Sequence, residues 1–447
     1  MIFLRSWRLI IRKPIRKKYN FISGGMKMKK RGIAILAILC MVLPVFAWGK
    51  KKSDATKGAK TGGKTTIEFF NGKVEISAIL KDLIAEYEKE NPNISIELNT
   101  SSDSATVLSS RMASDDTPDV FTNWPNSTFF EQVDSGYIMD LSSTGIMDNI
   151  QDSARNQWRH NGKEYAATIS FNCSGIWYNK DMFVKAGIGH TPTTWNELID
   201  DCKILQKAGY TPFVTSAKQT DITDRQLQVF LASTLPKAQY DSFEADTSRK
   251  TVDPRKAYGA RLKIMGQKML QLVSYSQEDT LGTDQDSATA NFANGKGAMM
   301  IGGSWLLASI TSANPSINVS MMPIPGDTAA ETNTCAYPGD MSLCIAAHSK
   351  VQKEAVAFVK WMTSKTIAEQ FAKREGNPSC IKGVTYVAPQ FADLYANYVT
   401  TGKYILNPDC NWFTSQQRAV GAVIQQLYYE KNTDSFASNM ADAFNNN

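Results

Sequence analysis

Histidine is scarce in this chain, and the motifs that mark hydrolytic enzymes are missing from it. The three histidines among the 447 residues, His160, His190 and His348, lie far apart and form no metal-ligand spacing. No GxSxG or HExxH motif occurs, and no Cys–His arrangement indicates a nucleophile. The sequence therefore predicts no catalytic residues, no metal site and no cofactor. A secreted glycoside-acting enzyme stays open as an alternative, because two carboxylates facing one cleft leave no mark in a sequence.

Acidic residues are absent from residues 1–47, which hold 11 of the 49 Lys and Arg residues. The formal net charge of +6 comes from this front segment, because the rest of the chain has 38 basic against 43 acidic side chains. Nucleic-acid binding needs a basic surface on the folded body, so we exclude nucleic acid as a partner. The length exceeds one ordinary core and predicts two domains or lobes.

The front segment resembles an export signal. Residues 26–31 (MKMKKR) form a basic region, an apolar run follows, and small residues near position 47 predict cleavage there. Residues 1–25 are expected to be an over-long start. Cys40 is a candidate lipidation site, and residues 32–48 are just long enough to stay as a membrane anchor. We expect a periplasmic or extracytoplasmic protein, with free and membrane-anchored forms both open.

A flexible tether is expected at residues 48–65, because residues 49–65 are rich in Lys, Gly, Thr and Ser and contain no apolar residue larger than Ala. Beyond residue 47 the chain has six cysteines: Cys173, Cys202, Cys335, Cys344, Cys380 and Cys410. An even count in an exported protein permits disulfides. Small buried thiols are the alternative.

Strands alternate with helices after the tether. The patterns predict a strand at 67–70, an amphipathic helix at 76–87, a strand at 94–98, a helix at 105–114 and a strand at 119–122. Such alternation predicts an α/β fold with mostly parallel sheets. Ligands bind at the carboxyl ends of strands in these sheets, and Asn71 and Trp124 each lie just past a strand.

Six segments carry a resemblance to a known family. They are EYEKENPNISIE (86–97), TPDVF (117–121), NGKEYAATISFNCSGIWYNKDMFVKAG (161–187), TPTTWNELIDDC (191–202), FANGKGAMMIGGSW (292–305) and HSKVQKEAVAFVKWMTS (348–364). Together, in this order, they resemble an extracellular solute-binding protein of the sugar-binding family 1, similar to maltose-binding protein. Such a protein feeds an ABC importer. Thr168 and Trp177 depart from the family's signature segment.

The resemblance implies a two-lobed periplasmic-binding-protein fold of type II, with the ligand held between the lobes. Mapped by motif, lobe I takes residues 66–179 and 342–378, and lobe II takes 180–338 and 382–447. The chain is expected to cross between the lobes near residues 179–181, 339–341 and 379–383. Pro338 and Gly339 form a composition break of the kind found at hinges.

The same resemblance implies that the protein binds a sugar or oligosaccharide, closes about its hinge and delivers the ligand to ABC permease subunits that cytosolic ATPases drive. We expect a monomer. A ferric-iron or other small-solute binding protein of the same fold is the alternative. Tyr428 and Tyr429 are an adjacent pair of the kind that can hold iron, although neighbours on a helix point about 100° apart.

Candidate ligand-binding residues follow from the chemistry of a sugar, which presents C–H faces to aromatic rings and hydroxyls to polar side chains. Gly303 is expected to let ligand and backbone approach closely, just before Trp305. The stacking candidates are Trp305, Trp124, Trp412 and Trp177, and the hydroxyl-binding candidates are Asn71, Asp340, Asn126 and Lys218.

Overall fold

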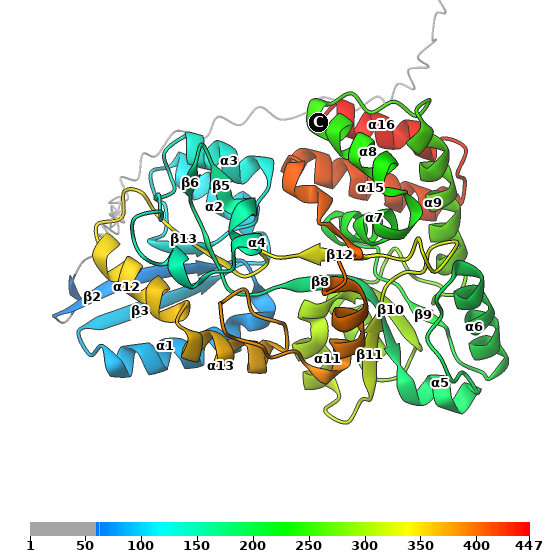
Figure 1. Ribbon diagram of the computed structural model, residues 1–447, viewed down its shortest axis with the longest axis horizontal. Coiled ribbons are helices and arrows are strands. Elements are labelled where there is room, and N and C mark those ends of the chain that lie inside the picture. Colours follow the sequence, from blue (N-terminus) through cyan, green and yellow to red (C-terminus); the bar gives the residue numbers. More distant parts are fainter. Residues whose placement is uncertain (1–59, 62) are drawn as a thin grey trace, which may run out of the picture. The chain divides into compact units, whose positions relative to one another are not determined.

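The computed structural model describes residues 60–61 and 63–447 (Figure 1). The expected export signal, Cys40 and most of the tether lie outside the described residues. The end of the expected tether is a β-hairpin, because β1 (Lys60–Thr61) pairs antiparallel with β2 (Lys64–Asn71). Among the described residues, no helix has the length and apolar character needed to cross a membrane.

One mixed sheet has the strand order β1-β2-β4-β13-β7, with β3 also paired to β2. Its other strands are β3 (Ile94–Thr100), β4 (Val120–Thr122), β7 (Ala167–Thr168) and β13 (Ser342–Ile345). Strand β2 runs parallel to β3 and β4, whereas β13 runs antiparallel to β4 and β7. The early strand–helix alternation predicted from the sequence is therefore confirmed. The expectation of mostly parallel sheets is wrong, because β2 pairs antiparallel with β1, and β13 pairs antiparallel with β4 and β7.

Helices cover this sheet and complete the first lobe. They are α1 (Ser77–Glu90), α2 (Ser104–Ala113), α3 (Ser127–Asp134), α4 (Asp152–Arg155), α12 (Gln352–Met362) and α13 (Lys365–Glu375), with a hairpin of β5 (Arg159–His160) and β6 (Lys163–Glu164) beside them. The apolar positions predicted for the first helix are buried in α1, and they pack in one cluster with Phe358 of α12 and Phe371 of α13. Figure 1 shows α1, α12 and α13 together on one side of β2 and β3.

A second mixed sheet has the order β14-β12-β8-β10-β9, with β11 also paired to β8. Its strands are β8 (Asn172–Asn179), β9 (Phe213–Val214), β10 (Met299–Gly303), β11 (Val319–Met322), β12 (Thr334–Tyr337) and β14 (Tyr404–Leu406). All eight residues of β8 are buried, which fits a central strand.

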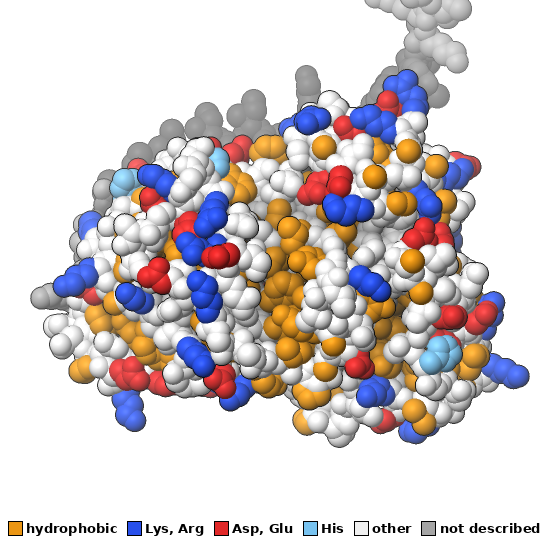
Figure 2. Space-filling model, in the orientation of Figure 1, with side chains coloured by type: hydrophobic (Ala, Val, Ile, Leu, Met, Phe, Trp, Pro, Cys, Tyr) orange, Lys and Arg blue, Asp and Glu red, His pale blue; other side chains and the backbone are white. Residues whose placement is uncertain are grey.

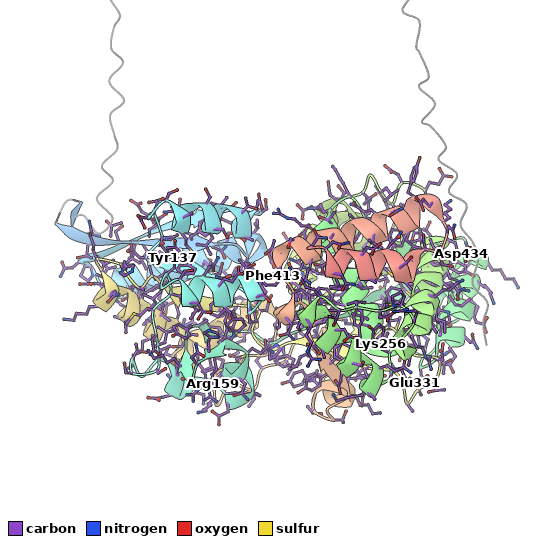
Figure 3. All side chains as sticks on the ribbon, turned by 90° about the horizontal axis from the view of Figure 1, so that it is seen from above. Tyr137, Arg159, Lys256, Glu331, Phe413 and Asp434 are labelled. Carbon is purple, nitrogen blue, oxygen red and sulfur yellow. The ribbon has the colours of Figure 1, made fainter. Side chains whose placement is uncertain are left out.

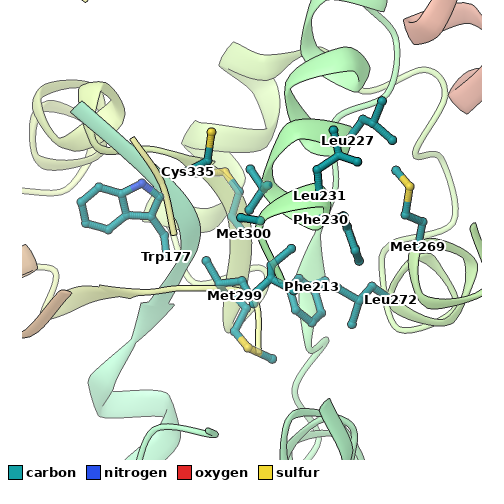
Figure 4. Close-up of a cluster of buried hydrophobic side chains, with 14 of the residues drawn as sticks. Trp177, Phe213, Leu227, Phe230, Leu231, Met269, Leu272, Met299, Met300 and Cys335 are labelled. Atoms are coloured by element: carbon teal, nitrogen blue, oxygen red, sulfur yellow. The ribbon is translucent and has the colours of Figure 1, made fainter. Parts of the chain in front are cut away.

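The helices of this second lobe are α5 (Lys180–Ala186), α6 (Trp195–Lys207), α7 (Thr220–Thr234), α8 (Lys237–Arg249), α9 (Ala257–Val273), α10 (Gln285–Ala293), α11 (Leu307–Ala313), α14 (Ala392–Leu394), α15 (Thr414–Glu430) and α16 (Phe436–Asn445). Figure 4 shows its core, where Trp177, Phe213, Phe230 and Met299 lie among other buried side chains. Each lobe thus has its own apolar core.

The chain passes between the two sheets three times, and the first two crossing segments hydrogen-bond to each other and to Cys380, which precedes the third. Residues 169–171 join β7 to β8, and residues 338–341 join β12 to β13. Ile169 N donates to Met341 O at 2.7 Å, and Cys380 N donates to Ile169 O at 2.7 Å. In the third crossing, Val384 packs in the first lobe and Ala388 in the second.

Two expected boundaries are therefore corrected. The first crossing lies at 169–171 rather than 179–181, because β8 pairs with β10, β11 and β12 and so belongs to the second sheet. The third lies at 385–387 rather than 379–383, because Ile381 and Val384 pack in the first lobe's core. The second lies at 338–341.

All six cysteines of the described residues are free thiols, and all but the half-buried Cys410 are buried. Burial raises the pKa of the Cys173 and Cys344 thiols above its usual range, which makes them poor nucleophiles. The structure therefore favours the buried-thiol alternative over a disulfide framework.

One acidic side chain is buried in the second lobe without full hydrogen bonding. Asp201 on α6 is 2% exposed, and its Oδ2 atom has no hydrogen-bond partner among the residues that the structure describes. Burial raises its pKa from 3.8 to about 6, a rise that His190 opposes and Glu197 and Asp200 reinforce. The folded chain therefore binds the Asp201 proton more tightly than the unfolded chain does, and the contribution of Asp201 to stability falls as the pH rises from about 4 to about 6.

We predict that Asp201→Asn raises the free energy of unfolding by about 1–3 kcal/mol at a pH of about 7.5, because the asparagine needs no buried charge. Near a pH of about 4 the gain should vanish, because Asp201 is then protonated in the folded protein. Thermal unfolding at both pH values measures the difference. Asp200→Asn is the matched control, since the Asp200 side chain is 67% exposed. Equal effects at both pH values would contradict the prediction.

Candidate functional site

A cleft of about 430 Å³ lies between residues of the two lobes. The first lobe contributes Gly72, Lys73, Glu75, Ser102, Asp103, Ser104, Ala105, Trp124, Asn126 and Asp340. The second contributes Gln219, Thr220, Asp221, Asp224, Arg225, Trp305, Tyr337, Asn407, Asp409, Thr414, Gln417 and Arg418. The volume falls in the range of small-molecule sites. Figure 3 shows Phe413, beside the start of α15, between Tyr137 of the first lobe and Lys256 of the second.

The wall from the first lobe is built at the carboxyl ends of β2 and β4. Gly72 and Lys73 follow β2, and Trp124 follows β4. The loops are tied together, because Gly72 N donates to Thr122 Oγ1 at 2.7 Å. A side chain at Gly72 has no room, since a Cβ there would lie 2.8 Å from the Trp124 ring. The glycine therefore allows the half-buried indole to lie close against the loop.

Trp305 supplies the aromatic surface of the opposite wall. Its side chain is 7% exposed, and its ring packs edge-on against Tyr337 with centroids 5.4 Å apart. The ring folds back over Gly303, where a Cβ would lie 2.0 Å from it. Gly303 is thus needed to seat Trp305, rather than to admit a ligand to the backbone as the sequence suggested.

Charged and amide groups surround Trp305. The guanidinium carbon of Arg225 lies 5.8 Å from the indole centroid, and its ion pair with Asp221 is loose, at 3.9 Å. Asp224 is 3% exposed and accepts a hydrogen bond from Gln228 Nε2 at 2.7 Å. Burial raises the pKa of Asp224 well above its ordinary value, with Asp409 adding to the rise and Arg225 opposing it.

Asn407 and Asp409 complete this polar wall. Asn407 Nδ2 donates to Asp409 Oδ1 at 2.5 Å, and burial raises the pKa of Asp409. Asn407 Oδ1 is buried and has no hydrogen-bond partner within the described part of the chain. Because an unpaired buried acceptor is costly, this atom is ready to receive a donor from a ligand.

A buried lysine lies at the base of the cleft. Lys73 is 3% exposed, and its Nζ atom contacts Asp340 and lies 2.5 Å from Glu375 Oε1. Asn172 also donates to Asp340, and Trp124 Nε1 donates to Asp340 Oδ1 at 3.4 Å. One carboxylate thus receives donors from three segments of the chain.

Four predicted site residues line the cleft: Trp305, Trp124, Asp340 and Asn126. Asn126 also has a structural task, because its Oδ1 atom caps α3 by accepting from Phe129 N at 3.0 Å. Asn71 is fully buried beneath the cleft, where its side chain holds the backbone of Lys73 by bonds of 2.7 and 3.0 Å.

The other four are not brought to the cleft. Trp412 is fully buried, because its ring packs on Phe444 and its Nε1 atom donates to Thr247 Oγ1 at 3.2 Å. Trp177 is also fully buried and donates to Gly303 O at 2.9 Å. Gly303 itself lies behind Trp305, in a separate cavity of about 20 Å³. Lys218 pairs with Asp284 at 3.6 Å on the surface.

Several cleft residues were missed by the sequence analysis, chiefly Lys73, Asp224, Arg225 and Asp409. Asp224 and Arg225 lie near the start of α7, where charged residues usually form a solvated helix face. Asp409 is in the same irregular segment as Trp412 and precedes the long helix α15. The only feature of the sequence that could have indicated Asp409 was a polar loop followed by a long helix.

The tyrosine pair does not form a shared site. Tyr428 is buried and donates to Gln226 Oε1 at 2.9 Å, whereas Tyr429 is 78% exposed. Within the described residues, no group of three or more His, Cys, Asp or Glu side chains could hold a metal ion. On the face shown in Figure 2, acidic and basic side chains are interspersed rather than gathered by sign.

Comparison with known proteins identifies a family that the chain matches. A family model described as a bacterial extracellular solute-binding protein matches residues 71–369. The Multiple sugar-binding protein of Streptococcus mutans serotype c is 31% identical over 366 residues, which cover 80% of this chain and 83% of that protein. The diacetylchitobiose binding protein DasA of Streptomyces coelicolor is 25% identical over 362 residues, which cover 78% of this chain and 81% of that protein.

Solved structures show the same fold. The solute-binding protein RafE in complex with raffinose superposes with a TM-score of 0.77 at 24% identity, covering 86% of this chain and 99% of that chain. A sugar transporter of Bacillus licheniformis in complex with stachyose gives a TM-score of 0.70 at 16% identity, covering 86% of this chain and 100% of that chain. The two-lobed α/β fold expected from the sequence is confirmed. The chain belongs to the family of bacterial extracellular solute-binding proteins, which are binding proteins rather than enzymes.

Proposed function

We propose that this protein binds a sugar or oligosaccharide in the cleft and delivers it to the permease of an ABC importer. The observation that carries the proposal is that two indoles, Trp124 and Trp305, line one cleft between two lobes together with Asn407, whose buried Oδ1 atom has no hydrogen-bond partner among the described residues. The 31% identity to the Multiple sugar-binding protein of Streptococcus mutans supports the ligand class.

The cleft suits the two surfaces of a pyranose ring. An indole covers the apolar C–H face, while carboxylates and amides bind the hydroxyls. Asp224, Asp409 and Asn407 offer acceptors, and Arg225 offers donors that no close ion pair occupies. An uncharged, hydroxyl-rich ligand satisfies these groups without bringing a further charge into the cleft.

Closure of the lobes provides the binding mechanism. Contacts already join the walls at the cleft's outer side, where Arg418 donates to Thr106 Oγ1 at 2.8 Å and Thr128 Oγ1 lies 3.2 Å from Thr414 Oγ1. A ligand that touches both walls makes its full set of contacts only in the closed state, so it shifts the population toward closure. Hydroxyls left without partners in the closed cleft cost affinity, which gives discrimination among sugars.

Location and partners complete the proposal. Residues 1–47 export the chain, and residues 48–59 connect the body to any membrane-held end, with Cys40 as the alternative lipid anchor. The closed monomer docks on a two-subunit permease. A ferric-iron ligand is disfavoured, because the rings of Tyr428 and Tyr429 lie in different environments.

A ligand screen tests the proposal directly. Among mono- and oligosaccharides, ferric salts and phosphodiesters, we expect a neutral saccharide to raise the melting temperature, because a ligand at about 100 times its Kd adds about 2.7 kcal/mol to stability. The saccharide should be recovered chemically unchanged. Stabilisation by a ferric salt alone would overturn the ligand class, and progressive cleavage of an oligosaccharide would select the enzyme.

We predict that Trp124→Ala weakens saccharide binding by about tenfold or more while the melting temperature changes little. The ligand loses the ring on which it stacks, and the core stays intact because that ring is only half-buried. Titration calorimetry measures the affinity. Trp361→Ala is the matched control, since Trp361 lies on α12, away from the cleft, and is also half-buried. Its Nε1 atom donates a hydrogen bond to Glu90 at 2.9 Å. Unchanged affinity in Trp124→Ala would remove that indole from the site.

We predict that Gly303→Ala also weakens saccharide binding, because the new Cβ lies 2.0 Å from the Trp305 ring and forces it out of its position. Gly189→Ala is the control, because a Cβ at Gly189 meets no atom within 4 Å. Binding is measured by calorimetry and folding by circular dichroism. Wild-type affinity in Gly303→Ala would show that the seated position of Trp305 is not required.

A further inference from the structure

Two crossing segments and the end of α13 approach one buried ammonium group. Asn172 is the first residue of β8 and follows the first crossing, Asp340 is in the second, and Glu375 is the last residue of α13, before the third. Lys73 lies in the first lobe, directly after β2, and its side chain is 2% exposed. The lysine thus lies where the two lobes are joined.

The contacts form a closed network around Lys73 Nζ. The ammonium contacts Asp340, and it lies 2.5 Å from Glu375 Oε1. Asn172 donates to the same carboxylate of Asp340, and Ser170 Oγ donates to Glu375 Oε2 at 2.7 Å. The first two crossings and the end of α13 are therefore linked to Lys73 either directly or through one carboxylate.

The balance of charge makes the network depend on this one cation. Burial by itself lowers the pKa of Lys73, and attraction by Asp340 and Glu375 outweighs it, so the pKa lies above its ordinary value and the ammonium stays charged. Without the ammonium, two acidic groups with side chains 12% and 1% exposed would keep only the neutral donors of Asn172, Trp124 and Ser170. Such groups relieve repulsion by moving apart or by gaining water.

The open side of Asp340 connects this network to the cleft. Asp340 lines the cleft, whereas Glu375 does not. The two carboxylates take two of the three donors of Lys73 Nζ, and Asp340 presents its carboxylate at the cleft. Trp124, whose indole also lines the cleft, bonds to Asp340 at 3.4 Å.

We propose that Lys73 is a positioning residue that fixes the first two crossings relative to each other and to the end of α13, and that orients Asp340 and Trp124 for ligand. The effect of Lys73 on ligand binding rests on the proposed function, whereas its effect on the crossings does not. A lysine with a merely structural role would change stability and leave the spacing of the lobes and the affinity unaltered.

The test compares Lys73→Met with Lys268→Met. Lys268 is a matched buried lysine of α9, with a side chain 6% exposed, Nζ 2.7 Å from Asp327 and a contact to the Trp195 ring at 4.9 Å. Spin labels at Glu131→Cys in the first lobe and Lys237→Cys in the second, on a Cys410→Ser background, report the inter-lobe distance. Both labelled positions are exposed, and the native thiols that remain in the described part of the chain are buried.

We expect Lys73→Met to broaden the ligand-free distance distribution and to weaken saccharide binding by about tenfold or more. Lys268→Met should lower the melting temperature yet keep the distribution and hold affinity within about twofold. A wild-type distribution in folded Lys73→Met overturns the proposal, whatever its stability. If no saccharide binds the wild type, the proposed function fails while the distance comparison still decides the role of Lys73.

Glu375→Gln keeps the test decisive if Lys73→Met does not fold. The amide retains a partner for Ser170 and removes one of the two negative charges that Lys73 holds. We expect a smaller broadening in the same direction, with a parallel loss of affinity. A distribution and affinity equal to the wild type in this variant overturn the proposal equally.

Discussion

The ion pairs of Lys73 join parts of the chain that are remote in sequence, and the cleft is built outward from them. Lys73 is separated from Asp340 by 267 positions and from Glu375 by 302. Buried ion pairs add little net stability, because desolvation offsets most of the attraction, but removing one partner is costly. The network is therefore better understood as a device that specifies one arrangement of the crossings than as a source of stability.

The two walls of the cleft hold their tryptophans in different ways. The first lobe places Trp124 on a loop at the carboxyl end of β4, where the close approach of Gly72 and a hydrogen bond to Asp340 position the ring. The second lobe holds Trp305 almost entirely within its core, against Tyr337 and over Gly303. Trp305 is thus rigid before any ligand arrives, and a rigid aromatic surface loses little conformational entropy on binding.

Local patterns in the sequence predicted local structure well. The apolar spacing of residues 76–87 gives α1, and the alternation of short strands with helices gives the α/β fold. Trp124 was placed correctly because it follows a strand at the edge where ligands bind. Trp412 looked equivalent in sequence, but its burial depends on Phe444 of the last helix, which no local pattern reveals.

The same limit explains the misplaced boundary and the missed charges. Strand β8 belongs to the second sheet because of partners that lie more than a hundred residues away in β10, β11 and β12. In the sequence, Lys73 is an ordinary loop lysine after a strand. Its role depends on Asp340 and Glu375, which only the folded structure brings to it. Arg225 and Asp224 likewise become site residues only because α7 packs beside Trp305.

The shortness of the crossings has a consequence for how the walls meet. Only residues 169–171 separate β7 from β8, and only residues 338–341 separate β12 from β13. The opposing walls therefore face each other at a high effective concentration, since so few backbone torsions can change between the strands. Once a solute is bound to one wall, its contact with the other wall is almost an intramolecular event. Closing the two lobes therefore costs little of the binding free energy.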